Sequence, residues 1–180
     1  MALRRGIYIV PTNQWYIERT VWLIAGIVLL TSTGLAWWVN PYFALLIIAT
    51  GVASITVAFT GFCLVGNVLN KLGFPHRLGT EDSVPEKLYF MKTDAWYLER
   101  RIYVAVGFNI SLASVLSIVF SPWWLAFTGF VGLAMVWFAA TGYCIMANGL
   151  YWLGAEPRLA PLTGASCATT MSGSERAASA

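Results

Sequence analysis

The chain has 180 residues, of which 58% are hydrophobic and only 11% are charged, and its net charge is +3. A soluble domain has roughly a quarter of its residues charged, so this composition excludes a single aqueous globular domain. The basic residues stand among acidic neighbours and form no cluster, which excludes a nucleic-acid partner. The composition therefore indicates an integral membrane protein.

Two long stretches without charge set the number of membrane spans. No charged residue lies within 20–70 or within 102–155. As one helix, either stretch would be longer than about 70 Å, whereas the hydrocarbon core of a bilayer is about 30 Å thick. Each stretch therefore crosses twice. The predicted fold is an all-α membrane protein with four transmembrane helices, arranged as two tandem helical hairpins.

The two hairpins are copies of each other. Shifting the sequence by 81 positions aligns residues 15–78 with 96–159 without a gap, and 19 of the 64 aligned pairs are identical. Such self-similarity indicates a tandem duplication. We expect five regions: a cytoplasmic interfacial lead-in (1–19), a first transmembrane hairpin (20–70), a cytoplasmic linker (71–101), a second hairpin (102–155) and a flexible cytoplasmic tail (156–180).

Aromatic and basic residues precede the first helix of each hairpin. Trp15 and Arg19 stand before the first span, and Trp96 and Arg100 take the aligned positions before the third. Amphipathic rings favour the headgroup level, and basic side chains that flank a span snorkel to the interface. We predict that these four residues are interface anchors.

A capped turn joins the two spans of each hairpin. Asn is a preferred N-cap, and Pro suits the first helical position because its φ is preset and it has no N–H to satisfy. Asn40-Pro41 provides this device in the first hairpin, and Ser121-Pro122 repeats it in the second. The predicted first, second and fourth spans cover 20–39, 42–65 and 122–147.

Small residues recur at helical spacing in the second and fourth spans. In lipid the hydrophobic effect gives little net drive between helices, so small residues matter because they let backbones approach closely. We predict a packing seam between these two spans, formed by Gly51, Ser54, Ala58 and Gly61 in the second and by Gly132, Ala139 and Gly142 in the fourth.

The distribution of charge predicts the orientation. Every Lys and Arg lies on the side of the termini and the linker, and the two hairpin turns carry no charge. The positive-inside rule then places both termini and the linker in the cytoplasm. Because both hairpins enter with the same polarity, we expect a pseudo-two-fold axis along the membrane normal.

Few residues could carry chemistry. His76 is the only histidine, so a haem held by two histidines, a His-ligated chlorophyll and a multi-histidine metal site lack their ligands. We expect no catalytic residue, no metal and no cofactor. Asn109 is the only amide deep in a span, and we expect it to hydrogen-bond between helices, although a polar group in the bilayer is also a functional candidate.

Cys63 and Cys144 occupy aligned positions, and two interpretations of them stay open. Paired thiols could handle persulfide sulfur or change redox state, which requires access and a lowered pKa. Alternatively, each could be a small apolar residue in a close helix contact beside Gly61 or Gly142. No Lys, Arg or His stands within several residues of either thiol, which favours packing.

The repeated motifs also resemble a known family. The relevant residues are Arg19 and Arg100, the Pro122-Trp123-Trp124 turn, and the segments Thr60-Gly61-Phe62-Cys63 and Thr141-Gly142-Tyr143-Cys144. In this combination each repeat resembles the two-span transmembrane domain of YgaP-like inner-membrane rhodaneses, a domain of unknown function that also occurs alone in bacteria. The resemblance implies a bacterial inner (cytoplasmic) membrane and a domain that anchors and dimerises, here fused as a tandem.

Two departures from that family limit what the resemblance implies. Leu64 and Ile145 replace the Pro that usually follows the Cys, and no rhodanese domain is expected here, so sulfurtransferase activity is not implied. We predict a non-catalytic accessory or scaffolding subunit of a larger membrane complex, with respiratory, photosynthetic and sulfur-metabolising complexes as candidates. Its expected partners are membrane lipids and other subunits. The alternative is a transporter or conduit for a small sulfur species, or thiol-based sulfur handling by Cys63 and Cys144.

Overall fold

The computed structural model describes residues 6–79 and 88–159, so parts of the expected lead-in, linker and tail lie outside the described residues. Within these ranges the chain is all-helical. The described residues form six α-helices: α1 (Ile17–Trp38), α2 (Ala44–Thr60), α3 (Leu64–Lys71), α4 (Leu98–Val119), α5 (Trp124–Thr141) and α6 (Ile145–Trp152). A short 3-10 helix, η1 (Pro41–Phe43), lies between α1 and α2.

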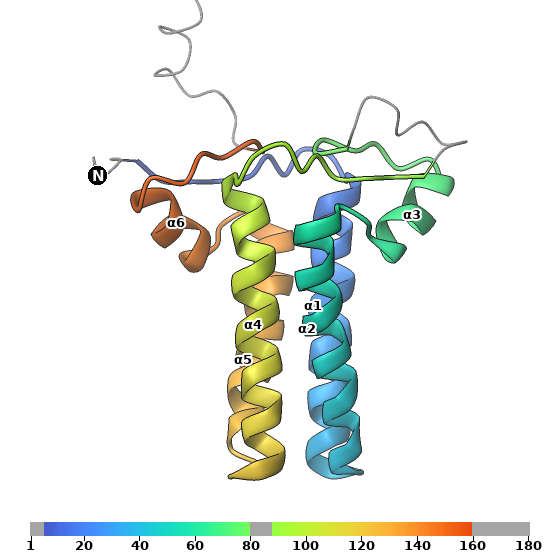
Figure 1. Ribbon diagram of the computed structural model, residues 1–180, viewed down its shortest axis with the longest axis vertical. Helices are drawn as coiled ribbons and strands as arrows, with labels where there is room; N and C mark the ends of the chain where they lie inside the picture. The colour runs from blue at the N-terminus through green and yellow to red at the C-terminus, as the bar shows by residue number, and fades with distance from the viewer. Residues whose placement is uncertain (1–5, 80–87, 160–180) are drawn as a thin grey trace, which may run out of the picture.

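Four of these helical segments are long and apolar enough to cross a membrane, which confirms the predicted fold class. They are α1, η1 together with α2, α4, and α5. Figure 1 shows both hairpin turns at one end of the bundle, while the connections to α3 and α6 lie at the other end. The two short helices project on opposite flanks of the bundle. The pseudo-two-fold axis stays a prediction.

The turn between α1 and α2 forms as the sequence predicts. Asn40 is extended, and its side-chain oxygen accepts a hydrogen bond from the backbone N–H of Tyr42 at 2.9 Å. Pro41 takes the first helical position after it. In the second hairpin the Ser121 hydroxyl accepts a longer bond, of 3.4 Å, from the N–H of Trp123. Both turns therefore use a side-chain cap to reverse the chain.

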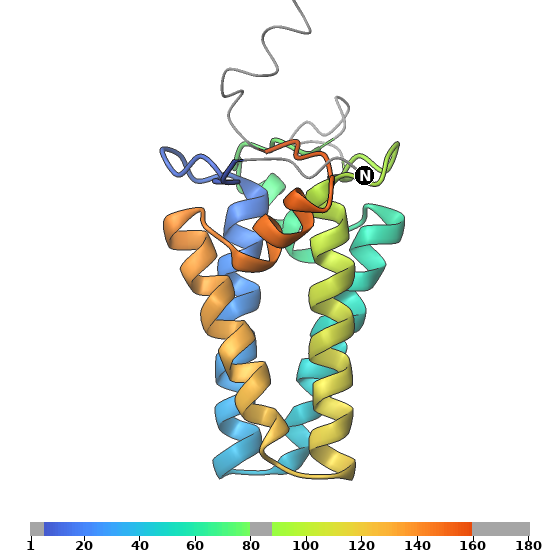
Figure 2. The same ribbon diagram turned by 90° about the vertical axis from the view of Figure 1, so that its left-hand side faces the viewer.

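The main helix contacts run between the hairpins, not within them. α1 packs along α5, and α2 packs along α4 (Figure 2). The predicted seam between the second and fourth spans is therefore wrong. The small residues instead pack against the first helix of the other hairpin. Gly51 of α2 lies against Gly107 of α4, and Gly132 of α5 lies against Gly26 of α1. A side chain at Gly51 would collide with the Gly107 carbonyl, so this close approach requires glycine.

The spanning helices end earlier than predicted. Gly61 and Gly142, expected in the seam, end α2 and α5 in the left-handed conformation with φ +74°. This conformation is the usual glycine C-cap and stops a helix. The spans therefore do not continue to Val65 and Ala147, and the residues after each glycine start the separate helices α3 and α6. Of the other seam residues, Ala58 and Ala139 are buried and Ser54 is half-buried.

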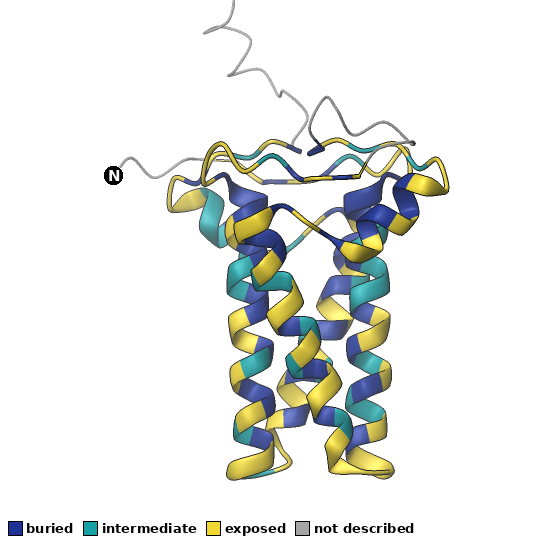
Figure 3. Ribbon diagram, turned by 45° about the vertical axis from the view of Figure 1, so that its right-hand side comes forward, coloured by how far each residue is buried: buried dark blue, intermediate teal, exposed yellow. Residues whose placement is uncertain are grey.

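Burial is uneven along the bundle. Figure 3 shows mostly exposed residues at the turn end and more buried ones near α3 and α6. Along the four spans only 28% to 39% of each apolar window is buried inside the protein. The remaining apolar surface faces outward, as lipid-facing helices require. The densest packing therefore lies at the end that also holds the charged residues.

Candidate functional site

The buried charged residues and the buried asparagines gather at one end of the bundle, here called the polar cap, which comprises residues 6–19, 61–79, 88–100 and 142–159. Glu18, at the start of α1, is only 2% exposed. Its carboxylate accepts hydrogen bonds from the backbone N–H groups of Arg77 and Leu78, the latter at 2.6 Å, and from the Tyr89 hydroxyl at 3.0 Å. The charge is thus solvated by the chain itself.

Glu99 makes the same set of contacts at the start of α4. It is also 2% exposed. Its carboxylate accepts from the N–H groups of Arg158 and Leu159, at 3.0 and 2.8 Å, and from the Tyr8 hydroxyl at 2.8 Å. Each carboxylate therefore binds the segment that follows the short helix of its own repeat. In both cases the tyrosine comes from the segment that precedes the other repeat: Tyr89, which binds Glu18, is in the linker before the second repeat, and Tyr8, which binds Glu99, is in the segment before the first.

Two buried asparagines hold these tyrosine segments in place. The Asn67 side chain in α3 accepts from the Tyr89 N–H at 2.8 Å and donates to the Tyr89 carbonyl at 3.0 Å. Asn148 in α6 pairs in the same way with the N–H and carbonyl of Tyr8, at 2.7 and 3.0 Å. Each asparagine thus satisfies the backbone N–H and carbonyl of one tyrosine in an extended segment, as a neighbouring β-strand would.

Arg19 lies inside the cap, although we expected it to extend to the interface. It is 9% exposed, and its Nε donates to the Ala139 carbonyl in the last turn of α5 at 2.6 Å. A second nitrogen donates to the Thr12 carbonyl at 2.8 Å, and the guanidinium lies 4.0 Å from the ring centroid of Trp15. A cation at a helix C-terminus satisfies free carbonyls and complements the helix dipole.

Arg100 plays the same part for α2. It is 6% exposed and donates to the Ala58 carbonyl and to the Thr93 carbonyl, while its guanidinium lies 4.0 Å from the centroid of Trp96. The expectation that these arginines snorkel outward is therefore wrong, because the open carbonyls of the opposite hairpin hold them inside. Trp15 and Trp96 remain 47% and 45% exposed.

Burial and the neighbouring carboxylates keep Tyr8 and Tyr89 neutral. Burial raises the pKa of Tyr8 well above its ordinary value of 10, and the neighbouring Glu99 carboxylate raises it further. Burial and the Glu18 carboxylate raise the pKa of Tyr89 in the same way. Each phenol therefore stays a hydrogen-bond donor to its carboxylate. Within this network of hydrogen bonds the four buried charged residues, Glu18, Arg19, Glu99 and Arg100, are each bound to backbone groups.

Cys63 and Cys144 lie at the start of α3 and α6, respectively, and these helices are on opposite flanks of the bundle (Figure 1). The structure therefore does not bring them together as a pair. Cys63 is 8% exposed, and its sulfur accepts from the Gly66 N–H at 3.3 Å. Burial raises the pKa of its thiol, which disfavours the reactive thiolate. Cys144 is half-buried.

The only histidine packs in the cap. The ring of His76 lies 5.9 Å from that of Tyr89, and a side chain at Gly79 would collide with it. Among the described residues, no group of three or more His, Cys, Asp or Glu side chains is close enough to hold a metal ion.

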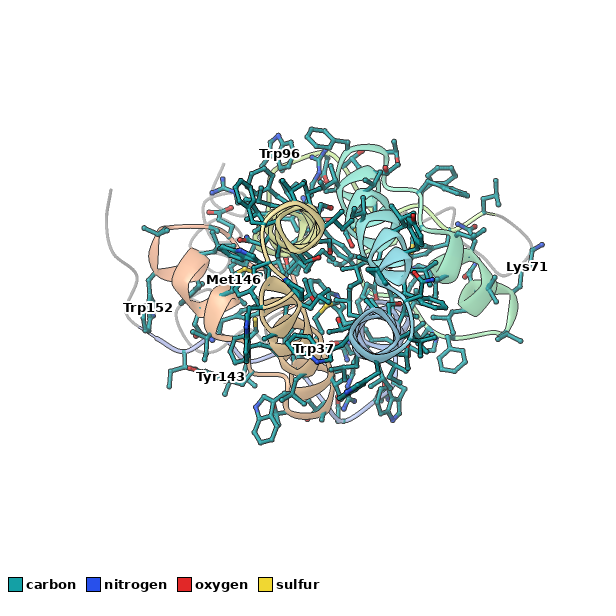
Figure 4. All side chains as sticks on the ribbon, turned by 90° about the horizontal axis from the view of Figure 1, so that it is seen from below. Trp37, Lys71, Trp96, Tyr143, Met146 and Trp152 are labelled. Carbon is teal, nitrogen blue, oxygen red and sulfur yellow. The ribbon has the colours of Figure 1, made fainter. Side chains whose placement is uncertain are left out.

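A second candidate site is an apolar groove of about 460 Å³ between α4, α5 and α6. Tyr143 and Met146, two of its lining residues, lie on the α6 side of the bundle (Figure 4). Asn109 also lines it. The Asn109 side chain donates at 2.7 Å to the Ala105 carbonyl of its own helix, so the expected bond between helices does not form.

The sequence analysis missed the roles of the acids, the tyrosines and the asparagines. One signal was present: the 81-residue shift continues upstream of the aligned range and pairs Tyr8 with Tyr89 and Thr12 with Thr93. Identity in a segment outside the spans would have suggested that these tyrosines bind something common to both repeats.

No family model, curated protein or solved structure matches this chain.

Proposed function

We propose that this protein is a non-catalytic accessory or scaffolding subunit of a larger membrane complex. The observation that supports it most is that the four buried charged residues of the polar cap are bound to backbone groups of the chain itself. A general acid, base or nucleophile must be able to exchange a proton or a bond with a substrate. Glu18, Glu99, Arg19 and Arg100 are instead bound to the chain's own backbone, and this arrangement favours rigidity over turnover.

The outward surface of the spans suits contact with other membrane helices. Aromatic side chains offer a large contact area to a partner and also favour the membrane interface. The most exposed ones gather near the turn end, where Trp38 is 83% exposed and Tyr42, Phe120 and Trp123 are each 76% exposed. A rigid bundle with this surface can hold neighbouring subunits at a fixed distance and depth.

Native mass spectrometry of gently solubilised membranes tests this proposal. We expect the chain, at its native expression level, to appear in complexes with other proteins. The variant Trp123→Ala tests the contact surface, because it reduces the aromatic area at the turn end and leaves the polar cap unchanged. We expect this variant to lose its partners without unfolding. A species that contains only this chain across several mild detergents would contradict the scaffold.

We also propose that the membrane is a bacterial inner membrane and that the polar cap faces the cytoplasm. The one-sided charge and the resemblance to YgaP-like domains support this. Single cysteines at Asn40 and Ser121, in a cysteine-free background, should react with an impermeant thiol reagent added to intact cells. A cysteine at Lys71 should react only after lysis. Labelling of the Lys71 position in intact cells would reverse the orientation.

The alternative, sulfur handling by Cys63 and Cys144, has less support because the two thiols lie on opposite flanks. The double variant Cys63→Ala, Cys144→Ala should keep both folding and complex formation. A sulfur-dependent growth defect in a strain whose double variant remains folded and assembled would favour the alternative.

A further inference from the structure

The groove between α4, α5 and α6 differs from a general lipid-facing surface in its depth and lining. Its volume of about 460 Å³ falls within the range of small-molecule sites, about 300–1,000 Å³. Six aromatic side chains surround it. They come from α1, α5 and the segment between α5 and α6, and are Trp22, Phe127, Phe130, Trp137, Phe138 and Tyr143.

Five of the six rings belong to the second repeat, and only Trp22 comes from the first. Four of the six rings lie on α5, and the 81-residue shift aligns them with smaller side chains on α2. The aligned pairs are Phe127 with Leu46, Phe130 with Ala49, Trp137 with Thr56 and Phe138 with Val57. Both repeats must span the same membrane, so crossing it does not require these rings.

The groove also contains one amide, that of Asn109. Asn109 is near the middle of α4, about 16 Å along the helix at about 1.5 Å per residue, and this places it near the centre of the hydrocarbon core. Its Nδ2 donates to Ala105, but no donor among the described residues is bonded to its Oδ1. The first repeat has Val28 at the aligned position. An unsatisfied acceptor at this depth is costly, because no bulk water reaches it.

We propose that this groove binds a phenolic lipid, a molecule with an aromatic ring, a hydroxyl group and an apolar tail, the class that includes membrane quinols. The ring would pack edge-to-face or offset against the aromatic lining, which aromatic pairs prefer. The hydroxyl would donate to Asn109 Oδ1, and the tail would leave through the open side of the groove. A phospholipid acyl chain has neither the ring nor the donor.

A matched pair of probes tests the proposal on the full chain in lipid nanodiscs. The probes are 4-dodecylphenol and dodecylbenzene, which differ only in the hydroxyl group. Binding is measured by native mass spectrometry of the intact nanodisc complex and by the change in tryptophan fluorescence. We expect the phenol to bind about fivefold more tightly, as one hydrogen bond within a membrane gives. Equal affinities for the two probes would overturn the proposal.

Three variants separate the hydrogen bond from the groove. Asn109→Val, which introduces the residue of the first repeat, should equalise the two affinities. Ala134→Phe should fill the groove and abolish binding of both probes, and Ala134→Leu serves the same purpose if the larger side chain prevents folding. Ala53→Phe, at the aligned outward position of α2, is the matched control and should leave both affinities unchanged. If a folded Ala134→Phe or Ala134→Leu variant still bound the phenol, the ligand would lie elsewhere and the proposal would be overturned.

Discussion

The polar cap and the membrane spans differ in how far the two repeats have diverged. In the cap, the contacts of the buried glutamates, arginines and asparagines in one repeat have their equivalents in the other. Glu18 and Glu99 each accept from two backbone amides and a tyrosine, and Asn67 and Asn148 each pair with an extended segment. These residues are identical in both copies because each must match a fixed backbone geometry.

The spans retain only a few such matches. Gly26 aligns with Gly107 and Gly51 with Gly132, and these four glycines form the closest helix contacts. Most other span positions face lipid and need only be apolar. The difference teaches that the cap specifies how the hairpins associate, whereas the spans were free to change. The aromatic groove lies where that freedom is greatest.

The largest expected effect comes from removing one cap carboxylate. Glu18→Ala leaves two backbone amides and the Tyr89 hydroxyl without their acceptor, and because each unsatisfied buried donor costs about 1–3 kcal/mol we expect a loss of about 3–5 kcal/mol in the free energy of unfolding. Glu99→Ala should cost nearly the same, because its contacts match. Circular dichroism during SDS titration in mixed micelles measures both. Glu18→Gln, which keeps one acceptor oxygen, should lose less. Clearly unequal losses at the two glutamates would contradict the equivalence of the two halves of the cap.

The glycine contacts should come next. Gly51→Leu forces a side chain against the Gly107 carbonyl and Ser111, and Gly132→Leu does so against Leu29 and the Gly26 carbonyl. We expect each to cost about 3 kcal/mol, at the upper end for overpacking. The control is Gly149→Leu, because a side chain there meets nothing within 4 Å. If this control destabilised the bundle as much, close helix approach would not be the cause.

Much of the fold followed from the sequence alone. The charge-free stretches predicted four spans, and the Asn40-Pro41 turn formed as expected. These features depend on local composition and on capping within a few residues. The ends of α2 and α5 were wrong because Gly61 and Gly142 stop each helix, although the apolar pattern continues past them. A glycine in an apolar run predicts either a close contact or a C-cap, and the pattern alone does not separate the two.

The pairing of the helices and the cap network were not predictable in the same way. The sequence identified the small-residue faces of α2 and α5. Two such similar faces can pack on each other, or each can pack on a different helix, as happens here with α4 and α1. The pairing depends on contacts between residues far apart in the sequence, such as the hydrogen bonds from Arg19 to the Ala139 carbonyl and from Arg100 to the Ala58 carbonyl. Such contacts join residues about 40 to 120 positions apart. No local pattern encodes them.

A smaller effect is expected from the asparagines that hold the tyrosine segments. Asn67→Ala removes an acceptor from the Tyr89 N–H and a donor from its carbonyl, and we expect a loss of about 1–2 kcal/mol. Asn148→Ala should match it. Hydrogen exchange at Tyr89 or Tyr8 should rise only in the respective variant. Asn109→Ala is the control for the spans and should leave global stability nearly unchanged. Protection that fell at both segments in either variant would show that the cap opens as one unit.

The smallest effect concerns a charge pair that only one half of the cap contains. Asp94 and Arg158 form two hydrogen bonds, of 2.8 and 2.7 Å, whereas the aligned residues of the first repeat are Asn13 and Arg77. The bond to Arg158 lowers the pKa of Asp94 below its ordinary value of 3.8. The pair therefore stabilises the fold above that value and loses its effect as the pH falls through the lowered pKa.

Asp94→Asn makes this position resemble the first repeat, and its effect should be small because Asp94 is 62% exposed and its pair is screened by solvent. The melting temperature of wild type should exceed that of the variant slightly at pH 7. The difference should shrink with added salt, and it should vanish once the pH is below the lowered pKa of Asp94, where the Asp94 carboxyl is as neutral as the amide of the variant. A difference that persisted unchanged in acid would have to come from the shape of the side chain and not from its charge. The two halves of the cap would then differ in packing, and the close equivalence seen at the glutamates and asparagines would not extend to this position.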